Sequence, residues 1–281
     1  MASLRYRIVN VFTQGSARFT GNPLCVFESG EGLDDVTLQA LARQLNLSET
    51  TFILPSTRAS AGVRIFTPAY EMAFAGHPTL GTAFVCRALG LAGDALTLEM
   101  KAGVIPVTAA GDRFRLQANA PSWRELDAPR ALLAELLCIE ETDLGDRPLW
   151  VQTGTEQLVV PLNSEAALRR AWPRAGAFDA LRGQEGPGRA YVFTRAGGNH
   201  LRSRYFFPLG SAILEDPATG SATANLGGWC LATGLALPCS FEITQGEFTG
   251  RPSTLFLTVD EQRRIFVSGD VVELGLGRFD L

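Results

Sequence analysis

The sequence predicts an α+β protein with two pseudo-symmetric domains, each a curved β-sheet around a central helix. Most apolar residues fall in short segments that alternate with polar residues, as strands do. Two longer apolar segments, 79–89 and 223–235, have a glycine at or near their ends and favour buried helices. The residues around these two helices also repeat along the chain, which indicates two similar halves.

The composition is typical of a well-cored globular protein and excludes several partners. Apolar residues make up 46% of the 281 residues and charged residues 19%. The net charge is −4 and there is no long basic run, so we expect neither nucleic acid nor an anionic membrane surface as a partner. Residues 1–10 lack the apolar core of a signal peptide, and no apolar run is long enough to span a bilayer. We therefore expect a cytoplasmic protein.

The cysteines and histidines argue against disulfides and metal. The five cysteines are odd in number and never at CxxC spacing: Cys25, Cys86, Cys138, Cys230 and Cys239. Because three of them lie in apolar helical segments, we expect buried, reduced thiols. With only His77 and His200 in the chain, a histidine-based metal site is not expected either.

The first half is expected to form a domain over residues 1–120. Its strands are expected at 6–12, 24–27, 52–54, 63–67, 96–99, 104–108 and 113–116. Asp34 and Asp35 can cap a helix over 36–45, and Asn46 can end it. Glu49 follows on a turn or strand edge, where position alone favours a solvated carboxylate.

The second half is expected to form a domain over residues 121–269, while the last strand, about 270–281, is a candidate to complete the first domain. Residues 121–129 resemble a linker and 176–188 a loop. Helices are expected at 130–137 and after Ser164, and strands at 150–153, 157–161, 191–194, 203–207, 241–244, 253–259, 265–268 and 271–274. We interpret four arginines as solvated charges: Arg169, Arg170, Arg202 and Arg204.

An internal repeat relates the two halves. The segment Arg64–Pro68 matches Arg204–Pro208, 140 residues later. The helix that follows Gly76 and ends at Gly90-Leu91 matches the helix that follows Gly220 and ends at Gly234-Leu235, 144 residues later, and Cys86 falls on Cys230. Two such domains about a pseudo-two-fold axis would bring two helix N-termini to one cleft, where ligand sites concentrate.

The turn Glu215–Ala222 is a candidate anion site, because a helix N-terminus directs unpaired N–H groups and a positive dipole outward. A carboxylate substrate held by two such N-termini would have its α-proton acidified and its enolate stabilised, so no metal or organic cofactor would be required. Glu49, His77 and Asp216 are the candidate acids and bases. We hypothesise that Glu49 moves a proton from one carbon to another while Asp216 and His77 orient the substrate or relay protons.

Simpler roles remain open for two of these residues. His77, before Pro78, could only cap its helix, and Ser221 could equally be a capping hydroxyl. The flanks of Ser221 do not form the G-x-S-x-G elbow of a serine hydrolase. Gly275-Leu276-Gly277 lacks the third glycine and the context of a dinucleotide fingerprint, so a Rossmann oxidoreductase is disfavoured.

Four segments resemble the signature blocks of the phenazine-biosynthesis PhzF-like family: Gly21–Leu24, Asn46–Phe52, Phe74–Gly81 and Glu215–Ala222. They lie in the family's order and span most of the chain. The resemblance implies two barrel-like domains of the diaminopimelate epimerase type with the active site between them. It also implies cofactor-independent isomerisation of a small carboxylate substrate, and commonly homodimers.

The resemblance also assigns site residues. The family's general acid/base glutamate falls on Glu49, its histidine on His77 and its aspartate on Asp216. The residues that line its site fall on Gly76, Gly220 and Ser221.

The chain departs from the pattern at three places. The loop 14–19 is longer than expected and includes Arg18, and Met72 stands where the family often has another apolar residue. The turns at His77 and Thr219 lack the thiols that act in the epimerase relatives, so two-thiol racemisation is not supported. Besides an isomerase, we keep two alternatives: a catalytically silent member that binds a small molecule or protein, and an amino-acid epimerase.

Overall fold

The structure is a computed structural model that describes residues 3–184 and 186–281. Met1, Ala2 and Glu185 lie outside the described residues, and with them the start of the first expected domain and one position of the expected loop 176–188.

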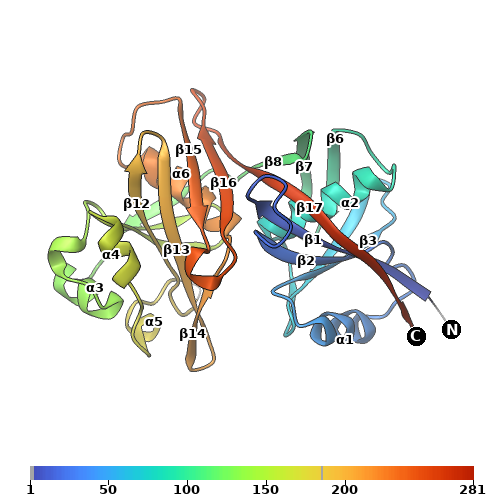
Figure 1. The fold of residues 1–281 in the computed structure, drawn as a ribbon, viewed down its shortest axis with the longest axis horizontal. Helices are drawn as coiled ribbons and strands as arrows, with labels where there is room; N and C mark the ends of the chain where they lie inside the picture. The colour runs from blue at the N-terminus through green and yellow to red at the C-terminus, as the bar shows by residue number, and fades with distance from the viewer. Residues whose placement is uncertain (1–2, 185) are drawn as a thin grey trace. The chain divides into compact units, whose positions relative to one another are not determined.

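The chain divides into two units, which Figure 1 shows with their elements labelled. Unit 1 comprises Met1–Gln117 and Ser268–Leu281, and unit 2 comprises Ala118–Val267. Each unit has a β-sheet wrapped around one long apolar helix, so the predicted α+β class is confirmed.

Unit 1 is a closed barrel of eight strands. In order around the barrel these are β1 (Ser3–Thr13), β2 (Asn22–Phe27), β3 (Thr50–Leu54), β4 (Ala61–Phe66), β6 (Ala95–Met100), β7 (Gly103–Ala110), β8 (Arg113–Gln117) and β17 (Ile265–Asp280), which returns to β1. The parallel pairs are β2–β3 and β4–β6. Each parallel pair is joined through a helix, because parallel neighbours need a crossover connection. These helices are α1 (Asp35–Leu45) and α2 (Gly76–Ala88), and the short β5 (Glu71–Met72) pairs with β4.

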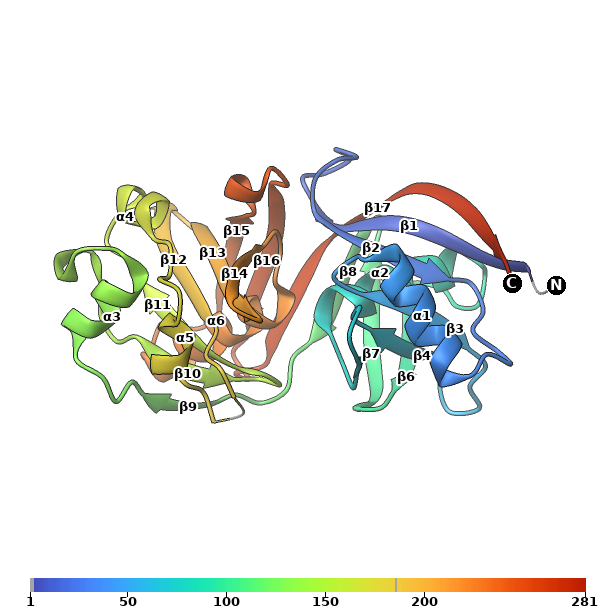
Figure 2. The same ribbon diagram turned by 90° about the horizontal axis from the view of Figure 1, so that it is seen from below.

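Helix α1 begins and ends as the sequence predicts. The Asp34 side chain accepts a hydrogen bond from the backbone N–H of Thr37, and Asn46 ends the helix in the left-handed conformation. Its apolar stripe, Leu38, Leu41 and Ala42, packs into a cluster that includes Phe27, Phe52 and Phe66. Figure 2 shows α1 lying beside β3 and β4.

Unit 2 repeats this plan. Its sheet runs β9 (Ser122–Glu125), β10 (Leu149–Gln152), β11 (Glu156–Pro161), β12 (Ala190–Gly197), β13 (His200–Leu209), β15 (Cys239–Gln245), β16 (Ser253–Val259) and the start of β17, while β14 (Ala212–Asp216) pairs with β13. The helices are α3 (Arg130–Leu137), α4 (Glu165–Arg170), α5 (Ala177–Ala180) and α6 (Gly220–Ala232), with short 3₁₀ turns at Glu141–Asp143 and Glu247–Thr249. Side chains from α3, α4 and α5 share one core cluster with strands β10 to β13.

The helices α2 and α6 occupy equivalent places and are packed too closely for larger residues. A Cβ atom on Gly81 of α2 would lie 2.6 Å from Leu24 Cδ2, and one on Gly227 of α6 would lie 2.7 Å from Ile265 Cγ2. Both helices are followed by a glycine at φ 74°, Gly90 and Gly234. The sequence repeat therefore corresponds to a repeat in the structure.

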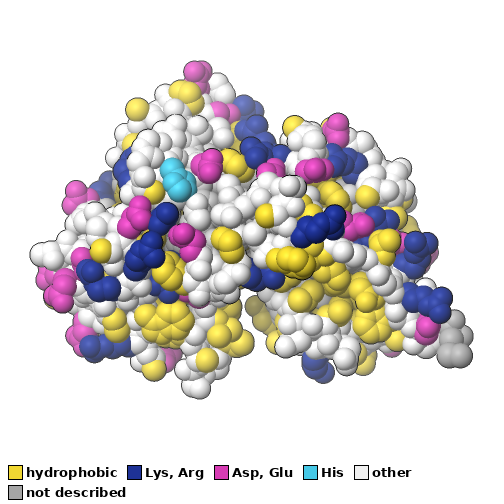
Figure 3. Space-filling model, in the orientation of Figure 1, with side chains coloured by type: hydrophobic (Ala, Val, Ile, Leu, Met, Phe, Trp, Pro, Cys, Tyr) yellow, Lys and Arg dark blue, Asp and Glu magenta, His cyan; other side chains and the backbone are white. Residues whose placement is uncertain are grey.

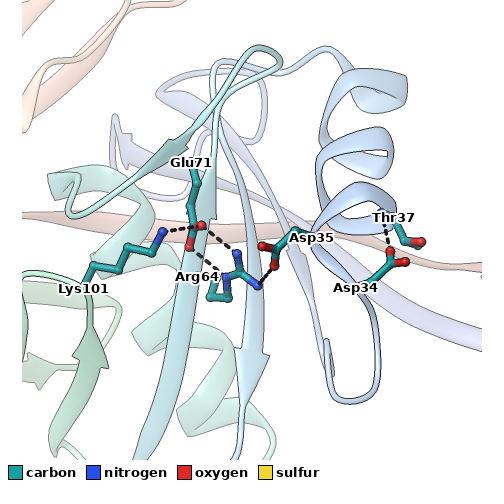
Figure 4. Close-up of polar contacts among 6 residues, drawn as sticks. All are labelled: Asp34, Asp35, Thr37, Arg64, Glu71 and Lys101. Carbon is teal, nitrogen blue, oxygen red and sulfur yellow. Dashed lines mark hydrogen bonds and ion pairs between the residues drawn. The ribbon is translucent and has the colours of Figure 1, made fainter.

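The repeat extends to an arginine–glutamate ion pair in each unit, which is partly buried in unit 1 and buried in unit 2. In unit 1, Arg64 donates to both carboxylate oxygens of Glu71, and Lys101 also contacts Glu71 (Figure 4). In unit 2, Arg204 donates to both carboxylate oxygens of Glu215. The register is the same in both units, because Glu71 pairs with Phe66 and Glu215 with Phe206.

Three expectations from the sequence are wrong. Arg204 is not a solvated charge, since it is 3% exposed and also donates to three backbone carbonyls. The expected linker contains β9, whose Ser122–Glu125 pair with β10 but expose most of their side chains, so their sequence lacks a strand pattern. Cys138 is exposed at the end of α3, whereas Cys25, Cys86 and Cys230 are buried.

Two expected elements have different bounds. The two short strands at 265–268 and 271–274 are parts of one long strand, β17. Gly269 does not break it, and its missing side chain makes room for Phe12, whose Cδ1 would lie 2.3 Å from a Cβ there. The expected loop 176–188 contains α5.

The surface carries charges of both signs. On the face that Figure 3 shows, Lys and Arg side chains are interspersed with Asp and Glu. Among the described residues, each helix is too short or too polar to cross a membrane.

Candidate active site

Glu49 is held at the start of a buried strand. Asn46 ends α1 at φ 51°, and β3 begins only four residues later at Thr50, so the backbone around Glu49 is fixed at both ends. The side chain is 17% exposed, not the solvated carboxylate that its position alone suggested. Its Oε2 atom accepts no hydrogen bond from any residue within 3–184 and 186–281.

Burial sets the chemistry of Glu49. Desolvation raises the pKa of this carboxyl from 4.5 to about 7, while a hydrogen bond from Ser48 acts in the opposite direction. A carboxyl with this pKa is populated in both protonation states at neutral pH. It can therefore accept and return a proton without a large thermodynamic barrier.

His77 lies against Glu49. It is the second residue of α2, and its Nε2 atom is 3.4 Å from Glu49 Oε2, close enough for an ion pair when the imidazole is protonated. The N-cap of the helix is Ala75, whose own side chain makes no capping hydrogen bond. Gly76 precedes His77 as the first helical residue.

Asp216 lies in unit 2, at the end of β14 and just before α6. Its carboxylate accepts a short hydrogen bond from the Thr219 hydroxyl. Gln245 of β15 holds the same turn, because its Nε2 donates to the Asp216 carbonyl and to Thr219 Oγ1, both at 2.9 Å, and its Oε1 accepts from the Thr219 N–H. This turn is therefore tied to the sheet at three points.

A glycine makes this attachment feasible. Gly246, directly after Gln245, has φ 79°, and a Cβ atom there would lie 2.3 Å from the Arg251 carbonyl oxygen and 2.5 Å from that of Pro217. Only glycine combines this conformation with such a close approach to the turn.

Gly220 and Ser221 are the first two residues of α6. The first hydrogen bond within the helix runs from the Thr223 N–H to the Thr219 carbonyl, so the preceding helical N–H groups have no partner within the helix. Ser221 Oγ accepts a hydrogen bond from Gln157 Nε2 at 3.0 Å. This end of α6 thus presents hydrogen-bond donors beside a carboxylate.

The structure groups the six sequence-predicted residues by unit. Gly76, His77 and Glu49 lie together in unit 1, and Asp216, Gly220 and Ser221 lie together in unit 2.

The repeat shows that the two groups are chemically different. Glu49 precedes β3 as Arg189 precedes β12, because Thr50 pairs with Phe66 and Ala190 with Phe206. Asp216 corresponds to Met72, since Asp216 follows Glu215 and Met72 follows the equivalent Glu71. Each candidate acid or base therefore occurs once and has no equivalent in the other unit.

Two buried residues that hold the start of α6, Gln157 and Gln245, are not among those predicted from the sequence; they are 1% and 0% exposed. The available signal was the position of each residue. Gln157 directly precedes the apolar residues of β11, and Gln245 directly precedes a glycine. A buried glutamine needs hydrogen-bond partners, so these positions could have been singled out.

A separate cavity of about 480 Å³ lies in unit 2. It is lined by Arg147, Arg195, Trp229 and Cys230 among others, near the opposite end of α6. None of the six candidate residues lines it.

Comparisons with known proteins agree along the whole chain. A family model described as phenazine biosynthesis-like protein matches residues 9–275. An uncharacterized isomerase of Pasteurella multocida is 39% identical over 276 residues, covering 97% of this chain and 92% of the relative. The trans-2,3-dihydro-3-hydroxyanthranilate isomerase of Pseudomonas aeruginosa is 36% identical over 263 residues, covering 90% and 89%.

Solved structures share the fold. A PhzF-family protein of Bacillus anthracis superposes with a TM-score of 0.87 at 24% identity, and the match covers all of both chains. A hydroxyproline epimerase of Agrobacterium vitis gives a TM-score of 0.65 at 15% identity, over 99% of this chain and 93% of that one. The predicted barrel-like, epimerase-type architecture is confirmed.

Proposed function

Because this chain belongs to the phenazine biosynthesis-like (PhzF-like) family, we propose that it moves a proton within a small carboxylate substrate, without a cofactor, using Glu49 as general acid and base. The isomerase class itself follows from the relatives, whose names are those of isomerases. The observation that carries the proposal is the buried Glu49 carboxyl with a pKa of about 7, against which His77 Nε2 lies at 3.4 Å.

In the proposed reaction, ionised Glu49 removes a proton from one carbon of the substrate and the resulting carboxylic acid returns it to another carbon. The reaction is balanced, because one proton leaves one carbon and one proton is added to another carbon, so the substrate and the product have the same composition. A pKa near ambient pH suits a group that must act as base and then as acid. His77 orients the carboxyl and stabilises its ionised form when the imidazole is protonated.

The proposal assigns recognition of the substrate to the helix ends. In unit 2, the N–H groups at Gly220 and the hydroxyl of Ser221 would hold the substrate's carboxylate, because helix N-termini favour anions. In unit 1, the N–H groups at Gly76 favour negative charge for the same reason. They would also stabilise the negative charge that develops when the proton leaves. Asp216, fixed by Thr219 and Gln245, would accept a hydrogen bond from a polar group of the substrate.

The first substrate to test is trans-2,3-dihydro-3-hydroxyanthranilate. A relative with 36% identity over 90% of this chain is named for isomerising it. It is a small, cyclic carboxylate, as the proposed chemistry requires. We also propose that the chain is a cytoplasmic homodimer, which light scattering of the purified protein would test.

Turnover of this substrate by three proteins tests the assignment of Glu49. The wild type should convert it, and Glu49→Gln, which keeps the shape but cannot take up a proton, should be slower by about 10²-fold or more. Glu31→Gln, on an exposed turn, is the control and should match the wild type. If Glu49→Gln retained full turnover, the assignment would be wrong.

The same experiment separates the alternatives. A catalytically silent binding protein would bind the substrate and release it unchanged in all three variants. An amino-acid epimerase would instead invert a stereocentre, which a loss of optical rotation with amino-acid substrates would reveal.

A further inference from the structure

A chain of buried amide side chains lies directly behind Ser221. Gln157 of β11 and Asn225 of α6 are 1% and 0% exposed. Asn225 Nδ2 donates to Gln157 Oε1 at 2.8 Å, and Gln157 Nε2 donates to Ser221 Oγ at 3.0 Å and to the Tyr205 hydroxyl at 3.2 Å. We call Gln157 and Asn225 the amide relay.

The orientation of the relay is decided by backbone groups that cannot reverse their roles. The Thr153 N–H can only donate, and it donates to Asn225 at 2.8 Å, so that atom of Asn225 is the oxygen Oδ1. The Thr155 carbonyl can only accept, and it accepts from Asn225 at 2.9 Å, so that atom is the nitrogen Nδ2. The second hydrogen of Nδ2 then points to Gln157, whose facing atom must be the oxygen Oε1. It follows that Gln157 presents its Nε2 to Ser221.

This orientation determines what Ser221 can do. Because Gln157 Nε2 has only hydrogens to offer, Ser221 Oγ must accept from it, and the single hydroxyl hydrogen of Ser221 is directed elsewhere. Among the described residues, Ser221 Oγ has no other side-chain hydrogen bond. The hydroxyl is therefore available as a donor beside the N–H groups at the start of α6.

The repeat shows that the fold does not need the relay. The equivalents of Gln157 and Asn225 in unit 1 are Leu24 and Gly81, and a Cβ atom on Gly81 would lie 2.6 Å from Leu24 Cδ2. Ser221 itself corresponds to His77. The same packing position is thus apolar in one unit and polar in the other. Burying polar groups costs free energy unless all of them make hydrogen bonds. We therefore infer that the buried amides of Gln157 and Asn225 have a role beyond packing.

We propose that Gln157, oriented by Asn225, is a positioning residue that fixes the Ser221 hydroxyl as a hydrogen-bond donor to the carboxylate of the substrate. The inference rests on the proposed function, in which Ser221 binds that carboxylate. Gln157 does not touch the substrate and acts through Ser221 alone.

Binding of two matched ligands tests this role. 3-Hydroxyanthranilate is the aromatic analogue of the proposed substrate, and 2-aminophenol is the same ring without the carboxylate. Gln157→Met should weaken binding of 3-hydroxyanthranilate about tenfold, the loss of one hydrogen bond, and leave 2-aminophenol unchanged. At a pH high enough to ionise the introduced carboxyl, Gln157→Glu keeps the acceptor toward Asn225 but offers only an acceptor to Ser221. It should turn the Ser221 hydrogen inward and weaken the carboxylate ligand about a hundredfold.

A double-mutant comparison separates positioning from a general structural effect. In the Ser221→Ala background, Gln157→Met should change binding of 3-hydroxyanthranilate less than twofold, because the hydroxyl it positions is absent. An equal loss with and without Ser221, or an equal loss for both ligands, would overturn the inference. So would the absence of wild-type binding to 3-hydroxyanthranilate.

A second measurement needs no ligand. In the wild type, both side-chain amide protons of Gln157 should exchange slowly with solvent in ¹⁵N NMR spectra, and Ser221→Ala should accelerate one of them. Fast exchange of both protons in the wild type would overturn the relay. The proposed function fails separately, if Glu49→Gln retains turnover, and that result would leave these amide protons unaffected.

Discussion

Replacing Glu49 by glutamine should make the protein more stable at high pH while removing its proposed activity. The folded-state pKa of about 7 lies above the ordinary 4.5, so the native protein keeps a proton on Glu49 over a range where the unfolded chain has lost it. Stability then falls as pH rises from about 4.5 to 7, because the native state binds more protons than the unfolded state. Glutamine has no proton to lose and escapes this fall.

The size of the effect follows from the two pKa values. Each pKa unit corresponds to about 1.36 kcal/mol, so the difference between 4.5 and about 7 amounts to about 3 kcal/mol. The advantage of Glu49→Gln over the wild type should therefore grow by about 3 kcal/mol between pH 4.5 and pH 8. Well below pH 4.5 the Glu49 carboxyl is protonated in both the folded and the unfolded protein, so the difference in stability between Glu49→Gln and the wild type should be constant.

Urea unfolding at a series of pH values measures this difference directly. The exposed variant Glu31→Gln is the control, and its stability should follow that of the wild type at each pH. If the free energies of unfolding of Glu49→Gln and the wild type changed with pH in parallel, the conclusion that burial raises the pKa of Glu49 would be refuted. A gain in stability with a loss of turnover would mark Glu49 as a residue whose burial costs stability.

Three further predictions concern unit 2. Gly246→Ala should destabilise the protein by about 2 kcal/mol or more in urea unfolding, because its Cβ would overlap two carbonyl oxygens at a positive φ, and an unchanged midpoint would contradict this. Arg204→Met should cost about 3–5 kcal/mol, since it leaves a 4% exposed carboxylate unpaired. The equivalent Arg64→Met is the control and should cost less, because Lys101 also neutralises its partner; equal losses would argue against this. The rate of alkylation of Cys239 by iodoacetamide should reach half its maximum below the pH at which an ordinary thiol does, because a hydrogen bond from Cys230 lowers the pKa of Cys239, and a midpoint at or above about pH 8.5 would contradict it.

Local signals in the sequence are sufficient for α1, for the two central helices α2 and α6, and for the repeat. Asp34 and Asn46 bound α1 as expected, because capping depends on neighbours in sequence. The glycines after α2 and α6 mark the ends of these two central helices in the sequence, because this signal is also local. The pairing of distant strands leaves no such signal, so the sequence predicts a linker where β9 lies and two short strands where β17 lies.

The buried polar groups were the hardest to foresee. Glutamate and arginine side chains usually lie on the surface, and only tertiary packing reduces the exposed fraction of the Glu49 and Arg204 side chains to 17% and 4%. Gln157 and Asn225 meet across 68 residues of sequence, and neither is flanked by a motif. In each case the partner lies on another element, which no local pattern records.

Proton transfer by Glu49 is tested most directly in deuterated water. The wild type should convert trans-2,3-dihydro-3-hydroxyanthranilate. The carbon that gains the proton should carry deuterium in those turnovers in which the Glu49 carboxyl exchanges with solvent before it returns the proton, as seen by NMR of the product. Glu49→Gln should form product and deuterated substrate at least about 10²-fold more slowly than the wild type. Deuterated product from Glu49→Gln at the wild-type rate would contradict the account, because the proton would then be carried by another group.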